Sequence, residues 1–139
     1  MCNCGCSRRK LNSVVGSASA WTTLAEGAST GQGAYVYAAG YTSRFRTEEF
    51  GKVGRIQFYI SNPSPGTIVA TTSIATLPAA LATGNSLPGG GVATAPFSTP
   101  SYMFPVAVST GQIGILAAAT ILEVSSDALI IVDMTFPLD

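Results

Sequence analysis

Histidine is absent from this 139-residue chain, which removes the commonest general base, proton shuttle and metal-ligating side chain. The adjacent Glu48 and Glu49 lie among basic residues, so we expect them to form ion pairs. Gly31-Gln32-Gly33 and Gly51-Lys52 lack the further glycines and the strand–loop–helix context of nucleotide-binding loops. We therefore predict no catalytic residues, no cofactor and no enzymatic activity.

Charged side chains are scarce as well. Asp, Glu, Lys and Arg make up 10% of the sequence, whereas alanine, glycine, serine and threonine fill almost half of it. A soluble monomer of this size normally carries a more highly charged surface. We therefore expect neighbouring subunits to cover much of the surface, as in a homo-oligomer. A secreted β-domain with a surface rich in serine and threonine is the alternative.

Basic residues are missing beyond Arg55. Residues 1–55 hold all seven Lys and Arg and carry a net charge of +4, whereas residues 56–139 carry −4. Without a contiguous basic stripe, we expect no specific binding of nucleic acid. The gradient also suggests that opposite ends of the chain face different partners, or pair head to tail.

Long apolar runs are missing too, and no segment reaches the length of a transmembrane helix. Residues 7–20 are similar to a twin-arginine signal, but the part between the arginines and the small residues is too short and polar for its apolar core. We expect a soluble protein made in a cytoplasm, with no membrane partner.

All the cysteine lies in the opening MCNCGCSRRK, as Cys2, Cys4 and Cys6. In an extended chain alternate residues lie about 6.6 Å apart, too far for one tetrahedral zinc ion, and three thiolates are one short of a closed structural site. Metal binding, disulfides between chains and free thiols packed at a crowded junction all stay open.

Residues 1–33 read as an extended N-terminal arm, because they show no sustained apolar period. Such a segment becomes ordered only along another surface. Trp21 and Leu24 would be its apolar anchors, and Arg8, Arg9 and Lys10 its charged contacts.

Residues 34–139 read as one β-domain. Residues 55–60 alternate, with Ile56, Phe58 and Ile60 on one face. Further strands are expected at 35–37, 67–74 and 102–108, and a terminal hairpin in the core at 113–124 and 128–136, with its turn at 125–127. One short helical piece is expected at 77–83.

Proline and glycine punctuate the chain between these blocks. We expect residues 84–100, which include Pro88-Gly89-Gly90-Gly91, to form a long irregular loop at the periphery. Short strands spaced by roughly ten residues predict an all-β fold, an antiparallel β-sandwich or barrel of jelly-roll-like type with an extended N-terminal arm.

The small size, few charges, basic arm and cysteine-rich start MCNCGCSRRK resemble the accessory structural proteins of tailed bacteriophage virions, in particular head decoration or cement proteins. The resemblance is one of general character over the whole chain. It implies a non-enzymatic β-sandwich or barrel, commonly trimeric, that binds and stabilises the major capsid protein. It also implies a virion protein assembled in the host cytoplasm.

Other functions stay open. A tail or head-to-tail connector component would have the same composition, so the sequence does not separate head from tail. A secreted carbohydrate-binding or adhesive module would require exposed aromatic residues near acids or amides, whereas the aromatic residues here mostly occupy expected strand positions.

Overall fold

The computed structural model describes residues 17–61, 66–68, 72–84, 87–95, 102–115, 122–124 and 129–139. The strands are β1 (Thr22–Thr23), β2 (Val36–Tyr37), β3 (Arg44–Glu48), β4 (Val53–Ser61), β5 (Gly66–Ile68), β6 (Ser73–Thr76), β7 (Leu87–Ala95), β8 (Tyr102–Ser109), β9 (Gln112–Ile115), β10 (Leu122–Val124) and β11 (Leu129–Pro137). Two single 3-10 turns, Glu49–Gly51 and Ala79–Leu81, complete these elements. The second lies within the short helical piece expected at 77–83.

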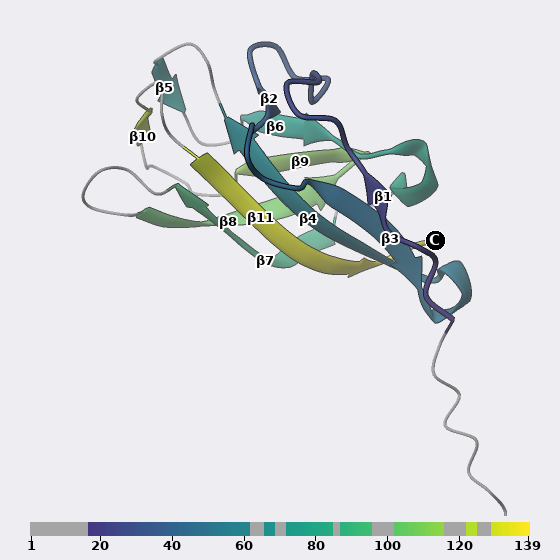
Figure 1. Ribbon diagram of the computed structural model, residues 1–139. Helices are drawn as coiled ribbons and strands as arrows, with labels where there is room; N and C mark the ends of the chain where they lie inside the picture. Colours follow the sequence, from purple (N-terminus) through teal and green to yellow (C-terminus); the bar gives the residue numbers. More distant parts are fainter. Residues whose placement is uncertain are drawn as a thin grey trace, which may run out of the picture.

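Among the described residues, nine strands form one sheet in the order β1-β3-β4-β11-β7-β8-β9-β6, and β2 pairs with the end of β4. β5 and β10 form a separate two-stranded sheet, and the strand pairs are antiparallel. The predicted antiparallel all-β class is therefore confirmed. In Figure 1 the strands β8, β9 and β6 lie behind β4 and β11, so the sheet curls around its own core.

The two margins of the curled sheet meet at Thr76 of β6. Its backbone nitrogen donates to the carbonyl oxygen of Thr30 at 2.9 Å, and its hydroxyl accepts a hydrogen bond from the Gln32 side chain at 2.8 Å. Within the described residues no strand ladder continues across this junction, so the sheet is curled and open.

The core lies inside the curl because β4 and β11 alternate buried and partly exposed residues along most of their length. The predicted face of Ile56, Phe58 and Ile60 is confirmed, since all three are fully buried. Other strands contribute the rest of the same cluster, which includes Ile74, Leu81, Val106, Val108, Ile113, Ile130, Val132, Met134 and Phe136. At 25 cal/mol per Å² of apolar area, side chains of this size each stabilise the fold by about 2 kcal/mol.

The predicted terminal hairpin is wrong. β11 pairs along its full length with β4, from Leu129 opposite Ser61 to Pro137 opposite Val53, and its other edge pairs with β7. β10 pairs with β5. The expectation assumed that strands close in sequence pair with each other, whereas the C-terminal strand returns to the middle of the sheet. The expected turn at 125–127 lies outside the described residues.

The predicted peripheral loop at 84–100 is also wrong over residues 87–95. These residues form β7, a central strand between β11 and β8. The pairing with β8 shifts register between Leu87 and Gly91, so the Pro-Gly-Gly-Gly run occupies an irregular stretch that glycine and proline tolerate. Val92–Ala95 then pair regularly, as their β-branched content favours. Residues 96–100 lie outside the described part.

Candidate functional site

The outer face of the sheet carries a polar cluster across β3, β4 and β11. On β3 the residues Arg44, Arg46 and Glu48 alternate with Phe45 and Thr47, and Phe45 packs against the core. Because alternate residues of a strand share a face, the three charged side chains point to the outer side together. Antiparallel register places Gln57 opposite Arg44, and Arg55 opposite Arg46.

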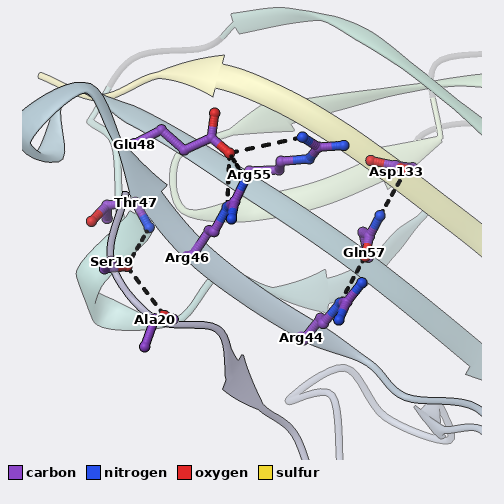
Figure 2. Close-up of polar contacts among 9 residues, drawn as sticks. All are labelled: Ser19, Ala20, Arg44, Arg46, Thr47, Glu48, Arg55, Gln57 and Asp133. Atoms are coloured by element: carbon purple, nitrogen blue, oxygen red, sulfur yellow. Dashed lines mark hydrogen bonds and ion pairs between the residues drawn. The ribbon is translucent and has the colours of Figure 1, made fainter. Parts of the chain in front are cut away.

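A chain of hydrogen bonds links the three strands (Figure 2). Arg44 Nε donates to Gln57 Oε1 at 2.8 Å, and Gln57 Nε2 donates to Asp133 Oδ2 at 3.1 Å. Gln57 and Asp133 are direct partners in the β4–β11 register. The amide therefore bridges a guanidinium on one side and a carboxylate on the other, which fixes its orientation.

Two arginines face each other directly in this cluster. Arg46 and Arg55 are opposite each other in register, an arrangement that is unfavourable for like charges. Glu48 compensates both of them: its carboxylate accepts a hydrogen bond from Arg46 Nε at 2.8 Å and lies 3.8 Å from Arg55 Nη1 (Figure 2). Arg55 Nε is buried and has no partner among the described residues.

Trp21 lies against the same arginines. The guanidinium carbons of Arg44 and Arg46 are each 4.4 Å from the centroid of the Trp21 ring, a cation–π arrangement. One indole ring thus contacts two side chains that are two residues apart on β3.

Backbone pairing holds the segment around Trp21 on the edge of β3. Thr22 and Thr23 pair with Phe45 and Arg44 as β1. Ser19 N donates to Thr47 O at 2.8 Å, and Leu24 N donates to Ser43 O at 2.8 Å. Residues 19–24 therefore form an added edge to the sheet.

The segment that follows continues along the sheet as far as β2. Gly27 N donates to Tyr37 O and Tyr37 N donates to Ala28 O, at 2.8 and 3.0 Å. Thr30 is buried, and Leu24 and Ala28 pack against the core. The described part of the predicted arm, residues 17–33, thus lies on this chain's own sheet, and its anchors Trp21 and Leu24 contact that sheet.

Several predicted site residues lie outside the described residues. They are Cys2, Cys4, Cys6, Arg8, Arg9 and Lys10. Among the residues that the structure does describe, no group of three or more Cys, Asp or Glu could hold a metal ion. No helix in that part of the chain is long and apolar enough to cross a membrane.

Two tyrosines next to this segment have raised pKa values because they are buried. Desolvation raises the pKa of Tyr37 to about 12 and raises the pKa of Tyr35 in the same direction. Both side chains belong to the core cluster, and Tyr37 contacts Phe58 edge-on with ring centroids 5.5 Å apart. The two tyrosines therefore contribute to the packing of the core. The outer face carries groups that can bind a partner: guanidinium, amide, carboxylate and indole.

Comparisons with known proteins find no relative: no family model, no curated protein and no solved structure matches the chain.

The polar cluster on the outer face of the sheet was not predicted from the sequence. The sequence contains the pattern that could have predicted the cluster, since Arg44, Arg46 and Glu48 alternate with apolar or small residues. The contact with Trp21 could not be predicted, because only the fold brings these two segments together.

Proposed function

We propose that this chain is a non-enzymatic structural protein of a tailed bacteriophage virion, a decoration or cement protein that binds and stabilises the major capsid shell. The observation that supports this is the course of the N-terminal segment. Ser19 is bonded to Thr47 near the end of β3, so the described part of the N-terminal segment begins at this end of the strand. A small β-domain with one attached end suits a protein that decorates a surface.

The basic triplet would supply the charged part of this attachment. Arg8, Arg9 and Lys10 would meet carboxylates of the capsid protein, and in water their main contribution is to steer the encounter. Trp21 lies on this chain's own sheet, against Arg44 and Arg46. In the proposal Trp21 therefore holds the segment that follows the triplet on the sheet, and it is not a contact to the capsid protein.

Association with copies of itself is the second part of the proposal, with a trimer favoured by the family resemblance. Cys2, Cys4 and Cys6 of neighbouring copies would gather near a symmetry axis. There they would pack as free thiols, cross-link after release into an oxidising medium, or share a metal ion.

Copy number tests the proposal and separates it from its nearest rival. A decoration protein binds a head in numbers proportional to the major capsid protein, whereas a connector component forms a closed ring and is present in far fewer copies. Quantitative mass spectrometry of purified particles of the encoding phage gives this ratio. A chain missing from the particles would contradict both assignments.

A second candidate function, binding of carbohydrate, is favoured by one observation. Tyr41 and Tyr59 stack with ring centroids 5.2 Å apart, and Tyr59 lies two residues from Gln57, which is bonded to Asp133. An exposed aromatic ring beside an amide and a carboxylate suits a sugar, whose C–H face stacks and whose hydroxyls hydrogen-bond. Purified protein on a glycan microarray tests this, and loss of any bound glycan in Tyr41→Ala would assign it to this pair.

A further inference from the structure

Phe50 is exposed at the tip of the β3–β4 hairpin. Its side chain is 68% exposed, and among the residues whose side chains the structure describes, only Tyr41, at 46%, is another large exposed hydrophobic residue. A single exposed hydrophobic residue is ordinary on a protein surface. Phe50 is distinguished by the backbone that carries it.

The backbone at this tip is left-handed at three successive residues. Glu49, Phe50 and Gly51 have φ values of 49°, 57° and 85°, and Lys52 N donates to Glu49 O at 3.2 Å to close the turn. With ψ of 34° at Phe50, the turn is of type I′, whose first central position favours asparagine or glycine. Phenylalanine is unfavourable at this position for two reasons. The left-handed backbone is strained for a residue that carries a side chain, and the aromatic ring is exposed to water.

The base of the hairpin is firmly held, so the turn does not relax easily. Five register pairs join β3 and β4, and Glu48 contacts Arg46 and Arg55 just below the turn. On the far side, Leu138 N donates to Lys52 O at 2.7 Å, and Leu138 packs against the core. The ring is therefore presented by a rigid support, as binding residues commonly are.

The second exposed aromatic residue lies at the other end of β3. Tyr41 precedes this strand in the chain and Phe50 follows it. Tyr41 stacks on Tyr59, which is held by Ser43: Tyr59 N donates to the Ser43 hydroxyl at 2.9 Å, and that hydroxyl donates to Tyr59 O at 3.2 Å. The pair forms a supported aromatic surface.

The charges around these two features are complementary. Phe50 lies between Glu49 and Lys52, both exposed. Beside Tyr59 on the outer face lie Arg44 and, through Gln57, Asp133. The tip carries one carboxylate and one ammonium group, and the outer face carries one guanidinium and one carboxylate. Each charge at the tip therefore has a group of opposite charge on the outer face.

We propose that Phe50 of one copy docks on the Tyr41–Tyr59 pair of the next copy, in a head-to-tail contact. Because donor and acceptor are different surfaces at opposite ends of β3, the contact is heterologous and closes into a ring such as a trimer, or continues as a chain. The inference specifies the self-association part of the proposed function and does not depend on the capsid as partner.

The experiment uses three variants of the full chain in sedimentation equilibrium at up to about 0.5 mM protein. Phe50→Asn removes the tip ring and Tyr41→Ala removes the acceptor ring, so each variant alone should remain monomeric while wild type associates. An equimolar mixture of the two retains one intact tip and one intact acceptor, and it should form dimers and no larger species. Phe50→Tyr, the matched control, should associate as wild type does.

Thermal unfolding separates this role from a structural one. Asparagine suits the left-handed turn, so Phe50→Asn should unfold about 3 °C above wild type, measured where both are monomeric. A wild type that stays monomeric throughout would overturn the inference. So would a mixture that stays monomeric while wild type associates, or a Phe50→Asn variant that still associates. Failure to bind particles would count against the capsid assignment only.

Discussion

At the scale of single residues, Glu48 holds together a region that would otherwise repel itself. It contacts Arg46 and Arg55, which face each other across β3 and β4. Glu48→Gln removes the charge and leaves the two guanidinium groups opposed, so the free energy of unfolding should fall by roughly 1 kcal/mol. Urea titration measures this. Glu49→Gln, the matched control at the exposed neighbour, should change it by less than about 0.5 kcal/mol; equal effects of the two variants would contradict the role of Glu48.

Tyr37 makes the stability sensitive to alkaline pH. Because burial raises its pKa to about 12, the folded state keeps a proton that the unfolded chain loses near pH 10. Its contribution is therefore complete below pH 10 and is lost as the pH rises toward 12. Tyr37→Phe should flatten the decline in unfolding free energy over this window, with Tyr35 responsible for part of the remainder. Parallel pH profiles for the variant and wild type would show that Tyr37 is not the titrating group.

At the scale of elements, the N-terminal segment is an added edge that is held by backbone hydrogen bonds and by the side chain of Trp21. β1 is only two residues long, and Trp21 contacts two arginines of β3. Trp21→Ala removes two cation–π contacts, so local opening of residues 19–24 should become about tenfold more frequent. Amide hydrogen exchange at Leu24, whose nitrogen is bonded to Ser43 O, measures this, and amides of β4 and β11 serve as the internal control. Unchanged exchange at Leu24 would mean that the backbone bonds suffice.

The elements also show what the sequence could and could not predict. Strict alternation at 55–60 was enough to place β4 and its buried face, because a half-exposed strand has that pattern. The Pro88-Gly89-Gly90-Gly91 run indicated a loop, but the sheet accommodates it through a register shift. The place of β11 depends on β4 partners that lie 68 to 84 residues earlier in the chain, and the position of Trp21 depends on Arg44 and Arg46, which lie 23 and 25 residues later. Local sequence pattern holds no information on such pairs.

At the scale of the whole molecule, the features proposed to bind are distributed over two ends. Ser19, Phe50 and the residue Leu138 near the C-terminus are linked to one end of β3 through Thr47 and Lys52. Tyr41 and Tyr59 lie toward the other end. The segment that begins at Ser17 and the Phe50 tip therefore lie at the same end of β3, and the Tyr41–Tyr59 pair lies toward the other end.

The most direct measurement is binding of a truncated chain to particles. Deleting residues 1–16 removes the cysteines and the basic triplet but leaves every described contact of Ser19 and Trp21 in place. We predict that the truncated protein folds, with the urea midpoint of the full chain, and no longer cosediments with capsids stripped of this protein, whereas the full chain restores occupancy. Truncated protein that decorates the capsids at full occupancy would contradict the account, and the attachment surface would then lie on the β-domain.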